Sequence, residues 1–263
     1  MLLTDDFVYI HMPKTAGTFV TQVLTRVYGE DRVINTDDAG TKHGTCRDIP
    51  ASHRHLPILS TRRNPYERYV SQYRFGWWKL YPEVFCGEDE MRRLFPHYPD
   101  LSFADYLDLA QQRFISHHRG QPTPYVNQRL APERQIGWHT AVFVRFYARH
   151  PVAVFNSLDE DAIKDRRYRS DLFDVRFLDV GNINRELHDF LLERGHPSEN
   201  VAFILDAERI LPKEGGRPAG DRWQSYYTPE LLDRVRVRER LLFDLFPEYD
   251  LPREAILDVA ETP

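Results

Sequence analysis

The chain has 263 residues, of which 41% are hydrophobic and 29% are charged, so it can bury a core as one large domain or two small ones. Its 35 basic and 40 acidic residues give a net charge of −5, which gives no reason to expect nucleic acid or an anionic membrane as a partner. Any anion site must therefore be a local concentration of basic groups.

The start of the chain and its cysteines bear on its location. Met1 to Asp6 includes two acids and no basic group, so we expect no signal peptide. No stretch reaches the roughly 18 uncharged apolar residues of a membrane span. The two cysteines, Cys46 and Cys86, lack metal-ligand spacing and are too few for a disulfide framework, which suits a reducing cytoplasm. A single disulfide between them stays open.

The first predicted element is a short buried strand over residues 7–11, FVYIH. After a loop, apolar residues at i, i+3, i+4 and i+7 predict an amphipathic helix that ends near Gly29, with Val20, Val23, Leu24 and Val27 on its buried face. A second strand is predicted over residues 33–35. A third is predicted over residues 56–61, where a proline limits pairing at the start.

The next helix begins at Asn64-Pro65, with the asparagine as N-cap and the proline at the first helical position. A further helix is predicted over residues 183–193, with Gly195 as its stop, and a long last helix runs from Thr228 to about Phe246. Short apolar runs predict four more strands, over residues 142–144, 152–155, 175–177 and 201–204.

Strands that alternate with helices predict an α/β fold with a central, mainly parallel sheet flanked by helices. Since the linker-like stretches are short, we expect a single domain over residues 1–263. In such sheets, ligands bind at the carboxyl ends of the strands. The segments that follow the strands are therefore the first place to look for a site.

The segment that follows the first strand, PKTAGT over residues 13–18, is typical of an anion-binding loop. A strand, a short loop and a helix in succession direct backbone N–H groups and the positive helix end at one spot. Lys14 adds a full charge, and Gly17 allows close approach of the backbone. The hydroxyls of Thr15 and Thr18 add donors. An ordinary strand–helix turn with a solvated lysine is the alternative.

A second basic segment follows the third strand, which ends in Arg62-Arg63. Ser71 lies further along the helix that begins after these arginines. An arginine at a strand end and a serine two turns up the helix can grip one phosphate from two sides, with bidentate bonds from the guanidinium. A surface helix decorated with arginines is the alternative.

Together, PKTAGTF (residues 13–19) and RRNPYERYVSQY (residues 62–73) resemble the sulfotransferases, especially the branch that includes the carbohydrate sulfotransferases. This resemblance implies a P-loop-like domain that uses 3′-phosphoadenosine-5′-phosphosulfate (PAPS) and releases adenosine 3′,5′-bisphosphate (PAP). In that family the first motif holds the 5′-phosphosulfate and the second holds the 3′-phosphate. By position, the co-substrate residues are Lys14, Thr15, Ala16, Gly17, Thr18, Phe19, Arg63 and Ser71.

The resemblance is weaker in the rest of the chain. GGRPAGDRW (residues 215–223) is similar to the loop that covers the nucleotide in cytosolic sulfotransferases, which makes Arg217 a further phosphate ligand. Residues 223–250 resemble the closing tyrosine-rich segment and helix. Residues 80–200 match no motif of the family, and we expect helices and insertions that set acceptor specificity there.

The resemblance also points to a base. Of the 11 histidines, His43 lies between the two motifs, where many sulfotransferases carry their catalytic histidine. A histidine can accept a proton at neutral pH. A loop histidine without a role is the alternative, and His11 is the second candidate, unless it packs against or orients Lys14. Some relatives use a glutamate, so the base stays open, whereas Lys14 is the expected catalytic cation.

The sequence also bears on rival functions. A P-loop kinase or other NTPase is disfavoured because no G-x-x-x-x-G-K-[ST] occurs in the chain. A non-catalytic nucleotide- or glycan-binding protein of the same fold stays open. No metal is expected to be required, because protein cations supply the positive charge that Mg²⁺ supplies in kinases.

The branch resemblance favours a carbohydrate or glycan hydroxyl as acceptor, while a phenol, a lipid or another small molecule stays open. Golgi members of this branch carry a membrane anchor, and this chain shows none. A bacterial cytoplasmic enzyme therefore fits best, although a shortened chain is an alternative. The sequence predicts no oligomeric state.

Overall fold

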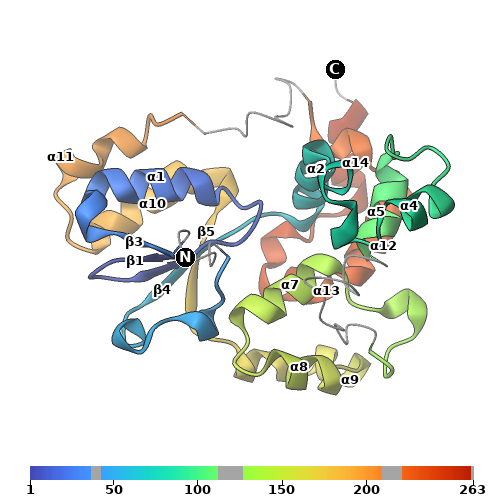
Figure 1. Cartoon of the computed structure of the whole chain (residues 1–263), viewed down its shortest axis with the longest axis horizontal. Helices are drawn as coiled ribbons and strands as arrows, with labels where there is room; N and C mark the ends of the chain where they lie inside the picture. The colour runs from blue at the N-terminus through green and yellow to red at the C-terminus, as the bar shows by residue number, and fades with distance from the viewer. Residues whose placement is uncertain (37–42, 112–126, 209–220, 262–263) are drawn as a thin grey trace. The chain divides into compact units, whose positions relative to one another are not determined.

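The computed structural model describes residues 1–36, 43–111, 127–208 and 221–261 (Figure 1). The chain divides into two compact units, of which the first comprises residues 1–63, 146–149 and 172–212. The second comprises residues 64–145, 150–171 and 213–263. The single domain over the whole chain therefore stays a prediction, and the two units are described in turn.

The first unit is built on a five-stranded sheet with the strand order β3-β1-β2-β4-β5. Strands β2, β4 and β5 are parallel, whereas β1 is antiparallel to both β2 and β3, so only β1 opposes the common direction. The mainly parallel sheet predicted from the sequence is confirmed. The strands are β1 (Leu2–Leu3), β2 (Val8–Ile10), β3 (Ile34–Asn35), β4 (Ile58–Arg62) and β5 (Val175–Asp179).

The register of the parallel strands brings their carboxyl ends to one edge of the sheet. Ile10 of β2 pairs with Ser60 of β4, and Ser60 pairs with Phe177 of β5. The loop after β2 and the arginines at the end of β4 therefore leave the sheet from the same edge. This edge is where an α/β sheet binds ligands.

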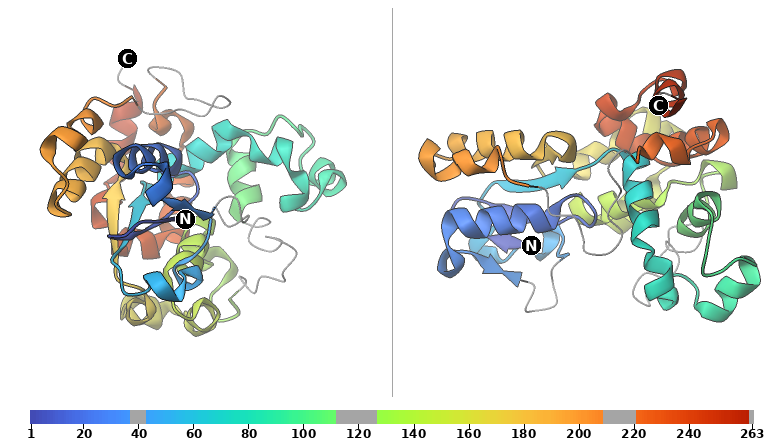
Figure 2. Two further views of the ribbon diagram at one scale, coloured as in Figure 1. Left: turned by 60° about the vertical axis from the view of Figure 1, so that its left-hand side comes forward. Right: turned by 90° about the horizontal axis from the view of Figure 1, so that it is seen from above.

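The helices of this unit cover the sheet with their apolar sides. Helices α1 (Gly17–Tyr28) and α10 (Ile183–Glu193) lie next to one another in Figure 1 and in both views of Figure 2. Phe7 contacts both helices, since its ring centroid lies 6.0 Å from that of Tyr28 and 4.9 Å from that of Phe190. Both helices were predicted, and Gly29 directly follows α1 as expected. Because edge-to-face aromatic pairs add to apolar burial, this cluster fixes the helices to the sheet.

The second unit is helical in the part of it that the structure describes. Its helix α2 (Pro65–Phe75) begins as predicted, because the Asn64 side chain accepts a hydrogen bond from the Tyr66 N–H at 2.9 Å. None of the described helices of either unit is long and apolar enough to cross a membrane. The other helices are α3 (Trp77–Leu80), α4 (Glu88–Leu94), α5 (Phe103–Leu109), α7 (Trp138–Tyr147, with its last two residues in the first unit), α8 (Pro151–Ser157), α9 (Glu160–Lys164), α12 (Pro229–Arg238), α13 (Arg240–Leu245) and α14 (Arg253–Glu261).

Three of the predicted strands are wrong, because residues 142–144, 152–155 and 201–204 are helical. Helix α7 is buried around most of its circumference, so its apolar residues follow one another without a helical period. In α8, Val154 is buried while Val152 is 57% exposed. The helix thus buries one side only, but a run of four apolar residues is too short to reveal the helical period. The last run forms the end of α11 (Ser198–Val201) and the 3₁₀ turn η11 (Ala202–Ile204).

The predicted long last helix is also interrupted, and Glu239 is the reason. Its fully buried carboxylate accepts hydrogen bonds from the N–H groups of His139 (3.1 Å) and Thr140 (2.7 Å) at the start of α7. The hydroxyls of Thr140 (2.7 Å) and Tyr69 (2.5 Å) also donate to it. Only a glycine fits at Gly137, where a Cβ would lie 2.1 Å from the carboxylate. Glu239 thus serves as the N-terminal cap of α7.

We predict that Glu239→Ala lowers the free energy of unfolding by about 3 kcal/mol, because buried donors lose their acceptor. Chemical denaturation measures the difference. Glu88→Ala is the control, since Glu88 is exposed and pairs with Arg92 on the surface of α4, where such pairs contribute at most about 1 kcal/mol. Equal losses in the two variants would contradict the capping role.

Candidate functional site

The loop between β2 and α1 has a strained backbone. Lys14 has a φ of 64° and Ala16 a φ of 59°, in the left-handed region that glycine favours. Each such residue costs roughly 1–3 kcal/mol and persists only where its surroundings impose it. The first turn of α1 contains no acidic residue, and its N-cap residue, Ala16, provides no side-chain hydrogen bond. The N–H groups and the positive end of α1 are therefore suited to an anion.

Two cations meet at this loop. Nη1 of Arg63, which follows β4, donates a hydrogen bond to the Lys14 carbonyl oxygen at 3.4 Å. Burial, and then the charge of Arg63, lower the pKa of Lys14 from 10.5 to about 8. An anion bound here would oppose both effects, since it stabilises the charged ammonium. The first unit thus brings together the lysine of the first motif and the arginine of the second.

The hydroxyl of Thr15 is turned toward the sheet. This side chain is 1% exposed, and its Oγ1 donates to the Met12 carbonyl oxygen at 2.8 Å. It also lies 2.8 Å from Oγ1 of Thr61 on β4, which in turn lies 3.2 Å from the hydroxyl of Tyr9 on β2. In this arrangement, the group of Thr15 left for an anion is its backbone N–H.

The two candidate bases lie side by side. The rings of His11 and His43 are 5.0 Å apart in an edge-to-face arrangement. Nδ1 of His43 lies 3.0 Å from the His11 carbonyl oxygen, and because a carbonyl only accepts, Nδ1 carries the hydrogen. Nε2 of a neutral His43 therefore holds the lone pair. A Cβ at Gly17 would lie 2.0 Å from the His11 ring, so this position admits only glycine.

The other predicted site residues are placed as follows. Thr18 is exposed in the first turn of α1, whereas Phe19 is 3% exposed and packs in the core, so its backbone alone is left for a ligand. Ser71 is half-buried on α2, in the second unit. Arg217 lies outside the described residues.

Sequence reasoning missed Tyr9 and Thr61 as members of this site. Tyr9 is 0% and Thr61 1% exposed, and each lies on a strand directly beside the anion loop. A polar residue just before the carboxyl end of a buried strand, as in the segment ILST, was the available signal. Such residues need a hydrogen-bond partner when buried.

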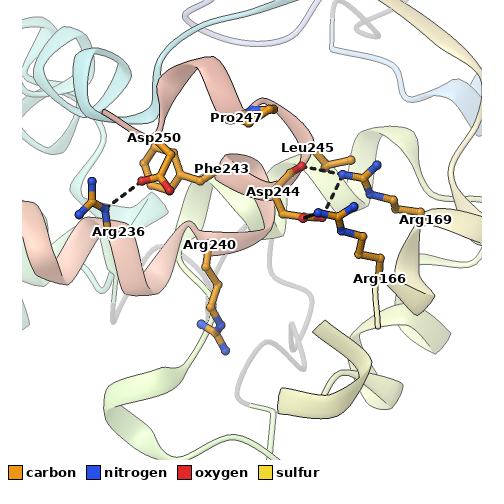
Figure 3. A pocket seen from close by; sticks show the side chains of 9 residues that line it. All are labelled: Arg166, Arg169, Arg236, Arg240, Phe243, Asp244, Leu245, Pro247 and Asp250. Atoms are coloured by element: carbon orange, nitrogen blue, oxygen red, sulfur yellow. Dashed lines mark hydrogen bonds and ion pairs between the residues drawn. The ribbon is translucent and has the colours of Figure 1, made fainter. Parts of the chain in front are cut away.

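A cavity of about 650 Å³ in the second unit is also rich in arginine (Figure 3). Asp244 pairs with Arg166 at 2.7 Å and with Arg169 at 3.0 Å. The other two arginines also have acidic partners, Asp250 for Arg236 and Glu160 for Arg240. These ion pairs tie the segment around residue 167 to α13, and we assign the cavity no binding role.

Within residues 1–36, 43–111, 127–208 and 221–261, no group of three or more His, Cys, Asp or Glu side chains could hold a metal ion.

The chain is similar to known proteins both in its sequence, by a family model, and in its structure. The family model described as "Sulfotransferase family" matches residues 2–133, which is half of the chain. Among solved structures, the chain is similar to the crystal structure of mouse sulfotransferase SULT7A1 complexed with PAP. The identity is 12% and the TM-score 0.40, over 98% of this chain and 89% of that one. No curated protein sequence matched the chain.

We predict that Lys14 titrates near pH 8 in the unliganded protein, measured by NMR of methylated lysine. Arg63→Ala should raise the midpoint but leave it below 10.5, because burial is the larger cause of the shift. Arg47→Ala, which removes an exposed arginine of the same unit, should leave the midpoint unchanged. A wild-type midpoint of 10.5 would contradict this description of the loop.

Proposed function

This chain belongs to the sulfotransferase family, and on that premise we propose that it transfers the sulfuryl group of PAPS to a hydroxyl of a carbohydrate or glycan. The family match confirms the predicted class of enzyme, a PAPS-dependent sulfotransferase. The observation that carries our assignment of the site is the meeting of Lys14 and Arg63 beside a strained loop and a helix start.

In the proposed reaction, the acceptor oxygen attacks sulfur in line with the bridging oxygen of the phosphosulfate. The bond between sulfur and that oxygen breaks, and the charge that develops on the 5′-phosphate must be stabilised. Lys14 would neutralise this charge, while the loop amides and the positive end of α1 hold the phosphate. At neutral pH Lys14 is mostly protonated, since its pKa is about 8.

We assign the 3′-phosphate to Arg63 and Ser71. This assignment rests on the resemblance of their motif, because the two residues belong to different units of the structure. A guanidinium offers bidentate bonds to a phosphate, and a serine hydroxyl adds one donor. Recognition of this phosphate would distinguish PAPS from ATP-like ligands.

We assign the general base to His43. Its Nδ1–H is committed to the His11 carbonyl, so Nε2 is the nitrogen that accepts the proton of the acceptor hydroxyl. The same carbonyl would stabilise the imidazolium formed in that step. His11 packs edge-on against this ring and against Gly17, which favours a role for His11 in orienting His43.

The carbohydrate acceptor is favoured by the branch that the motifs resemble. A cavity of about 390 Å³ in the second unit combines the aromatic and charged side chains that sugars use, among them Tyr73, Arg74, Lys79 and Asp100. Trp78 forms a buried wall, since it is 2% exposed and its indole N–H donates to the Pro99 carbonyl oxygen at 2.9 Å. This cavity supports a sugar acceptor, and a screen with labelled PAPS tests it against phenols and lipids.

The two rival functions make different demands. A kinase or NTPase would show Mg²⁺-dependent hydrolysis of ATP by the purified protein. A non-catalytic nucleotide-binding protein would bind PAP tightly, transfer no sulfate to any acceptor, and show no change on His43→Ala. If the wild type transfers label from PAPS to an acceptor and the His43→Ala variant does not, both rival functions are contradicted.

We predict that Lys14→Ala weakens binding of both PAP and adenosine 5′-monophosphate by about 10- to 100-fold, because a charge-assisted hydrogen bond is lost. Arg63→Ala should weaken the binding of PAP to a similar degree. It should leave the binding of adenosine 5′-monophosphate almost unchanged, since that ligand lacks the 3′-phosphate. Isothermal titration calorimetry measures both ligands.

Lys164→Ala and Arg32→Ala are the controls, since both residues are exposed. Equal affinities for PAP in wild type, Lys14→Ala and Arg63→Ala would refute the site. If Arg63→Ala instead weakened the binding of both PAP and adenosine 5′-monophosphate, this arginine would be assigned to the 5′-phosphate.

We also predict an acid limb in the pH profile of kcat, because a protonated imidazole no longer acts as a base. His43→Asn should lower kcat by about 10²- to 10⁴-fold and abolish this acid limb. On the alkaline side, kcat/KM for PAPS should fall above about pH 8, as Lys14 loses its charge.

His55→Asn serves as the control, because His55 is exposed in the same unit. If the acid limb were unchanged in His43→Asn but absent in His11→Asn, the role of base would be assigned to His11.

A further inference from the structure

A chain of buried hydroxyls runs beneath the anion loop. Thr15 donates its only hydroxyl hydrogen to the Met12 carbonyl oxygen, so Thr61 must donate in its 2.8 Å contact with Thr15. Tyr9 must then donate in its 3.2 Å contact with Thr61. The chain is therefore directed from Tyr9 through Thr61 and Thr15 to the main chain of the loop, and none of the three hydroxyl hydrogens is left over.

These hydrogen bonds join the anion loop to the sheet. Tyr9 and Thr61 lie on β2 and β4, two hydrogen-bonded parallel strands, and both side chains are buried. Thr15 lies between Lys14 and Ala16, the two residues in the left-handed region. Fixing the Thr15 side chain in the sheet therefore fixes the peptide groups on both sides of it, against the tendency of the loop to relax.

We propose that Thr61, supported by Tyr9, is a positioning residue that holds the loop in the conformation that binds the 5′-phosphosulfate. This inference rests on the proposed function of the loop. Thr61 touches neither the co-substrate nor the acceptor in this proposal, and it acts through Thr15. If the Thr61 hydroxyl is removed, Thr15 loses a hydrogen-bond donor and the Tyr9 hydroxyl loses its buried acceptor. The loop can then move to relieve both losses.

The position of Lys14 gives this proposal a direct readout. Its pKa is lowered because the loop keeps it partly out of water and close to Arg63. A loop that is released should return the Lys14 titration toward its ordinary value. A general loss of fold stability would not do so at temperatures where the variant stays folded.

The test compares a substitution that removes the hydroxyl group of Thr61 with one that removes its methyl group. Thr61→Val removes the hydroxyl and keeps the shape, and it should weaken PAP binding about tenfold or more. Thr61→Ser keeps the hydroxyl and should stay within about threefold of wild type. Equal effects of the two variants would overturn the proposal, because the hydroxyl would then not matter.

Ser60→Ala is the matched control. The Ser60 hydroxyl is also buried on β4, and it donates to the Ile10 carbonyl oxygen at 2.7 Å. Neighbouring strand residues face opposite sides of a sheet, so this change removes a similar hydrogen bond away from the Thr61 side chain. It should lower the melting temperature and leave PAP affinity within about threefold. A loss as large as that of Thr61→Val would overturn the proposal.

Amide hydrogen exchange of residues 15–18 and the Lys14 titration are measured in the unliganded variants as well. Faster exchange and a higher Lys14 midpoint in Thr61→Val, but not in Thr61→Ser, support the positioning role without any ligand. If wild type failed to bind PAP, the proposed function would fall while these measurements still decided the role of Thr61. If Thr61→Val did not fold, Thr61→Ala would replace it, and exchange and titration there that match those of Thr61→Ser would overturn the proposal.

Discussion

The parallel pairing of β2 with β4 is the constraint on which the rest of the site depends. Its register sets Ile10 beside Ser60, so the anion loop and Arg63 leave the same edge of the sheet. It also sets Tyr9 and Thr61 close enough to share a hydrogen bond. A slip of one residue would turn Thr61 to the opposite face of the sheet, and the hydroxyl chain would be lost.

The loop held by this pairing combines features that suit an anion. Two non-glycine residues in the left-handed region, a lysine with a lowered pKa and a neighbouring guanidinium are each unfavourable alone. In the proposed function all three become favourable around PAPS, because the loop amides, the helix end and Lys14 then face the 5′-phosphate while Arg63 faces the 3′-phosphate. A site whose charges are already in place needs little reorganisation during the reaction, which is the usual source of electrostatic catalysis.

Buried polar groups organise the second unit as well. Glu239 interrupts the last predicted helix and caps α7, with donors from two backbone amides and two hydroxyls. A buried carboxylate is tolerated only when its oxygens are hydrogen-bonded, and here the donors come from two segments far apart in sequence. The same carboxylate explains Gly137, where no larger residue fits. Specific contacts of this kind, rather than a repeated pattern, hold together segments of the second unit that lie far apart in the sequence.

The sequence by itself determined the sheet strands that flank the motifs, the end of α1, the start of α2, and the family, because local signals such as Asn64-Pro65 and the paired motifs act over short distances. The sequence wrongly predicts a strand within α7, because burial on nearly all sides of this helix erases the helical period. Only the tertiary structure decided that Thr15 faces the sheet, that His43 donates to His11, and that Glu239 caps α7. Each of these contacts joins residues whose pairing depends on the strand register or on helix packing, and no local pattern in a single sequence encodes such distances.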